Sequence, residues 1–135
     1  MTQNEKDLLL KDLCARLPYK VKVQDTYYKS LEPNPIWLID LHAQKVRLFA
    51  DEGYQSIEYI KPYLFPISSM TPEQKEEFDK MAELDVEYII TLIKNDVRNW
   101  TSGLNRLNWL LKNHFDVYDL IPMGLANDAT NKNIY

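Results

Sequence analysis

Two changes in the spacing of apolar residues predict an α+β fold for this chain of 135 residues. Apolar side chains recur every three to four positions before Pro18, alternate with polar ones after it, and return to helical spacing after Thr71. We therefore expect an N-terminal helix, a small antiparallel sheet or SH3-like barrel over about residues 20–60, and a helical C-terminal half that packs on it. Residues 1–126 are expected to form one domain, with 127–135 as a flexible polar tail.

A capping box and an amphipathic pattern predict the first helix. Thr2 and Glu5 have the spacing at which a hydroxyl and a carboxylate satisfy the first free amides of a helix, and Pro18 ends the run. One face should be apolar and buried, and the other polar and solvated. The expected buried face holds Leu9, Leu10, Leu13, Cys14 and Leu17, and the expected polar face holds Lys6, Asp7, Lys11, Asp12 and Arg16.

Short β-prone runs separated by turns predict the sheet. Val21 and Val23 alternate with polar residues, which is typical of a half-buried strand. The two prolines of residues 32–35 predict a loop, because proline cannot donate to a strand ladder, and Gly53 marks a turn. Strands are expected at about 20–24, 27–31, 36–41, 46–49 and 55–60, with 36–41 and 46–49 paired as a hairpin.

Prolines and a second capping box organise the C-terminal half. Pro62 and Pro66 predict an extended connector over 61–66, because neither suits a helix interior or a central strand. Thr71 and Gln74 form a capping box with a proline at the first helical position. The helical segments expected after the connector are 72–97 and 104–115, separated by an interruption at 100–103.

Composition narrows the classes of function. The formal charge is −4, so the electrostatic field of the whole protein does not favour nucleic-acid binding. Such binding would need a local cluster of basic residues. Three glycines cannot build a phosphate-binding or dinucleotide-binding loop, and one cysteine excludes a multi-cysteine zinc module. That residue, Cys14, is expected to be packed and inert. No apolar stretch has the length of a membrane span or a signal-peptide core, so we expect a cytoplasmic protein without membrane contact.

Two histidine–carboxylate pairs are the basis for an enzyme hypothesis. Asp40 and His42 would share one face of a strand, and His114 and Asp116 follow a helix. A metal site would need the two pairs to meet and would need defined further ligands. We therefore expect no metal, no cofactor and no catalytic residue. His42 should lie near solvent at a strand end, and His114 should cap its helix or pack beside Phe115 and the tryptophan of that helix.

Aromatic residues favour a role in protein interaction. Nine tyrosines and three tryptophans offer large contact areas at small entropic cost. Tyr63 and Phe65, on the stiff connector, are the candidate protein-binding residues, whereas Trp37 and Trp109 are expected in the core or at its edge. The preferred hypothesis is a non-enzymatic accessory or interaction protein with a protein partner.

A small nucleic-acid-associated regulator is the alternative hypothesis. Cations and aromatic rings interleave on the first predicted strands, as they do in sheets that stack bases. The first fifty residues hold eight basic and six acidic side chains, whereas residues 51–95 hold four basic and ten acidic ones. The candidate nucleic-acid-binding residues are Tyr19, Lys20, Lys22, Tyr27, Tyr28 and Lys29.

Three stretches of the chain also resemble a known group of proteins. They are 8–19, with the sequence LLLKDLCARLPY, then 61–71, which contains KPYL and SSMT, and 107–126, which contains LNWL, HFD and GLA. Together they are similar to short uncharacterised proteins of gut Bacteroidetes that are associated with phages or other mobile elements. The resemblance implies a mobile-element context and transfers no activity, ligand or site residue.

Overall fold

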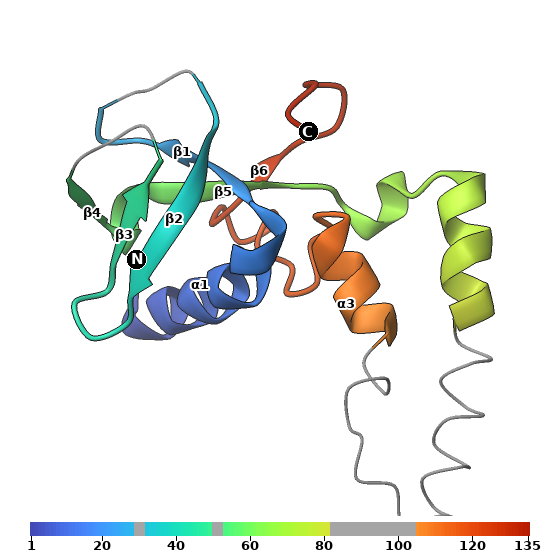
Figure 1. Ribbon diagram of the computed structural model, residues 1–135, viewed down its shortest axis with the longest axis horizontal. Coiled ribbons are helices and arrows are strands. Elements are labelled where there is room, and N and C mark those ends of the chain that lie inside the picture. Colours follow the sequence, from blue (N-terminus) through green and yellow to red (C-terminus); the bar gives the residue numbers. More distant parts are fainter. Residues whose placement is uncertain (29–31, 50–52, 82–104) are drawn as a thin grey trace, which may run out of the picture.

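The computed structural model describes residues 1–28, 32–49, 53–81 and 105–135. An N-terminal helix leads into a six-stranded sheet, and further helices follow (Figure 1). The helices are α1 (Gln3–Arg16), a helix over residues 72–81 and α3 (Asn105–Lys112). The strands are β1 (Lys22–Asp25), β2 (Asn34–Asp40), β3 (Lys45–Leu48), β4 (Tyr54–Ser56), β5 (Ile60–Leu64) and β6 (Asn127–Asp128).

The sheet is mostly antiparallel and open. The described strands have the order β4-β3-β2-β1-β5-β6, and of the pairs that they form only β5–β6 is parallel. The predicted α+β fold and the predicted β2–β3 hairpin are therefore confirmed. The barrel alternative is not, because β4 and β6 are two separate edges of the sheet.

The hydrophobic core lies between the sheet and α1. Leu9 and Leu13 of the helix are fully buried, as are Val23 and Val46 of the strands. Figure 1 shows α1 running beneath the sheet, with the chain that follows α3 returning beside it. That returning chain adds Leu120, Leu125 and Ala126 to the same core.

Both predicted capping boxes are present. The Thr2 hydroxyl accepts from the Glu5 amide at 3.2 Å, and the Glu5 carboxylate accepts from the Thr2 amide at 2.6 Å. The same exchange joins Thr71 and Gln74, at 3.2 and 2.9 Å. The starts of both helices are therefore set by local hydrogen bonds that a four-residue motif predicts.

The predicted helices after the connector are confirmed where the structure describes them. Residues 72–81 are helical, and the remainder of the expected segment, to 97, lies outside the described residues, as does the interruption at 100–103. The last helix, α3, ends at Lys112 and not at 115. Its chain turns at His114, which has a φ of 63° in the left-handed region.

The prediction of an extended connector over 61–66 is wrong. Residues 60–64 form β5, which lies between β1 and β6, with Pro62 opposite Val23. Proline is tolerated in a strand where its nitrogen needs no ladder partner. Since β6 pairs only with Tyr63 and Leu64, Pro62 lies in the part of β5 that has no β6 residue beside it.

The second predicted strand, 27–31, is also wrong in the part that the structure describes. Tyr27 and Tyr28 form a turn after β1, in which both backbone amides donate to the Oδ1 atom of the buried Asp25, at 2.9 and 3.3 Å. Because both amides donate to this carboxylate, they are not available for the backbone hydrogen bonds of a strand ladder. Residues 29–31 lie outside the described part of the chain.

Two further boundaries differ from the prediction. The expected loop at 32–35 overlaps β2, which begins at Asn34 and uses the carbonyl of Pro35 to accept from the Phe49 amide at 3.1 Å. The expected strand at 55–60 is divided by a 3-10 turn, Ile57–Tyr59, between β4 and β5. Pro35 lacks a backbone N–H donor but keeps its carbonyl acceptor, so it can lie near the start of β2, where the neighbouring chain donates to it.

Part of the segment expected as a flexible polar tail, 127–135, pairs with the sheet. Residues 127–128 form β6, and the Ala129 amide donates to the Leu64 carbonyl at 2.8 Å. Ala129 is 1% exposed. The polar composition of this segment reflects hydrogen bonding with the rest of the fold and not solvation alone.

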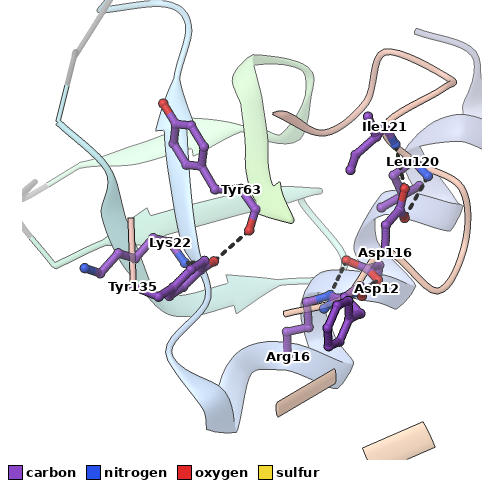
Figure 2. A network of polar contacts seen from close by, with 9 residues as sticks. Asp12, Arg16, Lys22, Tyr63, Asp116, Leu120, Ile121 and Tyr135 are labelled. Carbon is purple, nitrogen blue, oxygen red and sulfur yellow. Dashed lines mark hydrogen bonds and ion pairs between the residues drawn. The ribbon is translucent and has the colours of Figure 1, made fainter. Parts of the chain in front are cut away.

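The polar face predicted for the first helix is wrong at two positions. Asp12 and Arg16 are both fully buried, and two hydrogen bonds of 2.8 Å join the guanidinium to the carboxylate. Figure 2 shows Arg16 beside Asp12. Arg16 also donates to the Phe115 carbonyl at 2.6 Å. Burial raises the pKa of Asp12, and the hydrogen bonds and charge of Arg16 oppose that effect. The pair therefore carries a desolvation cost that its attraction offsets only in part.

We predict that replacing both partners of this pair is less harmful than replacing one. Asp12→Leu or Arg16→Met alone leaves a buried charge without its partner and should lower the free energy of unfolding by about 3–5 kcal/mol. The double variant should lose less than either single variant, because no charge remains buried. Urea unfolding measures all three.

The exposed Glu76–Lys80 pair supplies the control. Its side chains are about 70% exposed, so Glu76→Ala should change the free energy of unfolding by less than about 1 kcal/mol. Additive losses from the Asp12 and Arg16 substitutions in the double variant would contradict this account of the buried pair.

Candidate interaction surface

The outer face of the sheet, opposite α1, carries exposed apolar side chains on β2. A β-bulge shifts the register of β2 against β3 between Ile36 and Leu38. Ile36 is buried in the core, whereas Trp37 is 53% exposed and Leu38 is 40% exposed. The bulge thus allows two consecutive apolar residues to stay out of the core. The prediction that Trp37 belongs to the core is therefore wrong, whereas Trp109 is buried as predicted.

Neighbouring strands continue this exposed surface. Arg47 of β3 lies opposite Leu38 on one side and Tyr54 on the other, between the buried residues 46 and 48. Phe49 is 60% exposed and its ring centroid lies 6.2 Å from that of Trp37, while Tyr54 is 49% exposed. We call Trp37, Leu38, Arg47, Phe49 and Tyr54 the open aromatic face.

Arg47 is the charged centre of the open aromatic face. Its guanidinium lies over the Trp37 ring, 4.7 Å from the centroid, in a cation–π contact. Its Nε atom is buried and lacks a hydrogen-bond partner, and no carboxylate among the described residues forms an ion pair with it. A guanidinium that stacks through its plane can still donate from its edge, so Arg47 is suited to bind a carboxylate or phosphate.

The other half of the outer face is covered by the segment that ends at Tyr135. The backbone amide of Lys22 donates to the Tyr135 hydroxyl at 3.1 Å, and that hydroxyl donates to the Tyr63 carbonyl at 2.7 Å (Figure 2). The Lys22 ammonium donates to the carbonyl of Ile134 at 2.7 Å. Burial raises the pKa of Tyr135 to about 12, so the hydroxyl keeps its proton at neutral pH. These contacts connect β1 and β5 to the end of the described chain.

His114 packs against the Tyr135 ring. The two rings are stacked, with centroids 3.7 Å apart and planes at 8°. The Nδ1 atom of His114 is buried without a hydrogen-bond partner. Burial, and then the positive charges of Arg16 and Lys22, lower the pKa of His114 to about 4. His114 is therefore a neutral packing group at pH 7. It stacks on Tyr135, whereas the prediction was that it caps its helix or packs beside Phe115 and Trp109.

The two predicted protein-binding residues are not on an exposed connector. Tyr63 lies in β5 and is 8% exposed, so its ring offers little surface to a partner. Phe65 is half-buried and packs against Phe115 and Tyr135, with ring centroids 6.3 and 6.0 Å away. Both residues contribute to the junction between the sheet and the end of the chain.

The predicted nucleic-acid-binding residues do not form one continuous face. Tyr19 and Lys20 precede β1, whereas Tyr27 and Tyr28 follow it, so these pairs lie at opposite ends of the strand. Lys22, between them, is engaged with Tyr135 and its neighbour. Tyr27 and Tyr28 are exposed and pack with Tyr59 in an aromatic cluster, and Lys29 lies outside the described residues.

The structure does not bring the two histidines together. His42 is exposed in the turn between β2 and β3, as predicted, whereas His114 lies beside β5. In the described ranges, no group of three or more His, Cys, Asp or Glu side chains could hold a metal ion. Asp116 instead accepts from the amides of Leu120 and Ile121, each at 2.9 Å. Cys14 is half-buried, and burial raises the pKa of its thiol, which disfavours the nucleophilic thiolate.

Comparisons with protein-family models, with curated proteins and with solved structures find no match for this chain. In the part of the chain that the structure describes, no helix has both the length and the apolar character needed to cross a bilayer.

The open aromatic face was not among the predicted site residues. Its sequence signal is weak, because Ile36 to Ile39 are four consecutive apolar residues, which is also typical of a fully buried strand. Only the bulge decides which of them are exposed, and a bulge has no reliable signature without a glycine.

We predict that His114 makes stability sensitive to mild acid. Its pKa is about 4 in the folded protein and about 6.5 in an unfolded chain. As the pH falls from about 6.5 towards 4, the unfolded state therefore takes up a proton that the folded state does not, and stability is lost. The free energy of unfolding of His114→Gln should fall less steeply across this window than that of the unchanged protein. Urea unfolding at several pH values measures the slope.

His42→Gln is the matched control, because His42 is exposed. Its pH profile should parallel that of the unchanged protein. Identical slopes for His114→Gln and the unchanged protein would show that His114 is not the group responsible.

Proposed function

We propose that this protein is a non-enzymatic interaction module that binds a segment of another protein on the open aromatic face. The observation that carries the proposal is Arg47, which is stacked on the exposed Trp37 and has no anionic partner among the described residues. We infer that the partner segment supplies a carboxylate for Arg47 and apolar side chains for the surrounding rings.

The composition of the face supports a protein partner. Tryptophan, tyrosine and arginine are the residues most enriched where binding energy concentrates in protein interfaces, and the face holds one of each. Exposed apolar residues that are scattered singly need no explanation, but a contiguous group on one face of a sheet favours an interaction site. Trp37 lies on β2, Tyr54 lies on β4, and Phe49 directly follows β3 and donates its amide to the Pro35 carbonyl, so the sheet holds the three rings in a fixed arrangement.

The charges of β3 and of the whole chain favour a protein partner over a nucleic-acid partner. Lys45 and Arg47 are the cations of β3, and the chain as a whole carries −4. Each nucleic-acid phosphate that is bound needs its own cation, and two cations within an acidic protein support few such contacts. Binding one carboxylate of a protein partner requires only one cation, Arg47. The resemblance described above would make other proteins of a mobile element the first partners to examine.

Selection of displayed random peptides on the folded protein tests the proposal. We expect the selected peptides to combine Asp or Glu with aromatic or aliphatic residues. Trp37→Ala and Arg47→Gln should each weaken their binding by about 10-fold or more, as expected for central interface residues. Fluorescence anisotropy of labelled peptides measures the affinity, and thermal unfolding verifies that each variant is folded.

Tyr28→Ala is the matched control, because Tyr28 is a 67% exposed aromatic residue outside the open aromatic face. Its affinity for the selected peptides should equal that of the unchanged protein. The proposal fails if the peptides bind Trp37→Ala and Arg47→Gln as tightly as the unchanged protein, or if short oligonucleotides bind the face and no peptide does.

A further inference from the structure

A cavity of about 240 Å³ lies between three segments: the chain from the end of β5 to the start of the helix over 72–81, the chain just after α3, and the chain just after β6. It has room for about eight water molecules, at about 30 Å³ each. Its polar lining comes from Ser69, Thr71, Gln74, Asn113, Thr130 and Asn131. The cavity is separate from the open aromatic face, which shares no lining residue with it.

The polar lining retains unused hydrogen-bonding capacity. The Thr130 hydroxyl is buried and makes no hydrogen bond of good geometry, although it lies close enough to Asp128 to help lower the pKa of that carboxyl. Asn113 uses its amide nitrogen to donate to the Trp109 carbonyl at 2.9 Å, which leaves its own carbonyl oxygen for another donor. Asn131 has a φ of 60°, in the left-handed region, and its side chain makes no hydrogen bond with a described residue. The cavity therefore offers both donors and acceptors from three segments.

The lining is neutral and has an apolar side. All six polar residues carry hydroxyl or amide groups, and no Asp, Glu, Lys, Arg or His lines the cavity. Phe65 and Phe115 complete the lining, with centroids 6.3 Å apart and planes at 57°. Burying a charge without a partner is costly, so this lining selects a neutral ligand. Phe115 is 2% exposed, so the half-buried Phe65 supplies most of the apolar surface that a ligand can reach.

We propose that this cavity binds a small neutral polyhydroxylated ring, of the size of a monosaccharide. Sugar hydroxyls both donate and accept, which matches the mixed lining, and the C–H groups of the ring pack on the half-buried Phe65. Thr130, Asn131 and Asn113 are the principal binding residues. This inference does not depend on the proposed protein-binding role of the open aromatic face.

Titration of the ¹⁵N-labelled protein with monosaccharides, followed by NMR, tests the proposal. The probes are D-glucose, D-galactose, D-mannose, D-ribose and N-acetyl-D-glucosamine, with adenine and cytosine as flat comparison ligands. A ligand with so few atoms should bind with a Kd on the order of 1 mM. At least one sugar should saturably shift the amide signals of Asn113, Thr130 and Asn131.

Two variants and a control localise the binding. Thr130→Val keeps the shape of the side chain and removes the hydroxyl, so it should weaken sugar binding about 5-fold or more, and thermal unfolding verifies that the variant is folded. Asn131→Gly keeps the left-handed backbone, removes the amide and should weaken binding likewise. Ser68→Ala, at an exposed neighbour that does not line this cavity, should leave the affinity unchanged.

The outcomes that would overturn the proposal are distinct. No saturable shift with any sugar, equal affinity in Thr130→Val and the unchanged protein, or binding of adenine or cytosine in place of the sugars would each reject a monosaccharide site. Peptide binding at the open aromatic face would be unaffected by any of these results, since the two sites share no residue.

Discussion

The buried guanidinium of Arg16 is the constraint on which the rest of the fold depends. It joins Asp12 within α1 to the Phe115 carbonyl, 99 residues further along the chain. Phe115 in turn bridges to Phe65 just after β5. One charged side chain therefore sets where the helix, the sheet and the chain after α3 meet. Buried ion pairs contribute little net stability. We therefore infer that the Asp12–Arg16 pair serves mainly to select one arrangement of these segments over others.

That junction explains why the two halves of the outer sheet face differ. The chain after Phe115 returns to add β6 and then places Tyr135 over β1 and β5, which closes that half. Nothing among the described residues covers Trp37 and its neighbours on β2, β3 and β4 in the same way. The fold thus separates aromatic residues into a packed group around Tyr135 and an exposed group around Arg47. This separation is the physical basis of the proposed interaction surface.

Local signals predicted the helices and the hairpin, whereas contacts between distant segments were not predictable. The capping boxes at Thr2 and Thr71 depend on four consecutive residues, and the sequence displays them directly. Asp12 and Arg16 looked like a solvated pair because their partner, Phe115, is remote in sequence. Pro62 in β5 and Pro66 after it indicated a connector, although Pro62 is accommodated where β6 has not yet begun. The polar segment after residue 126 resembled a tail because its hydrogen-bond partners are far away in the chain.

The central claim is that the open aromatic face is uncovered in the free protein and is covered by an acidic, apolar partner segment. Hydroxyl-radical footprinting read by mass spectrometry tests it most directly. In the free protein, Trp37 and Phe49 should be oxidised faster than the buried Trp109 and Phe115. A saturating acidic peptide obtained by selection should then protect Trp37 and Phe49 and leave Tyr28 unchanged. Equal rates at Trp37 and Trp109 in the free protein, or protection of Tyr28 in place of Trp37, would contradict the account.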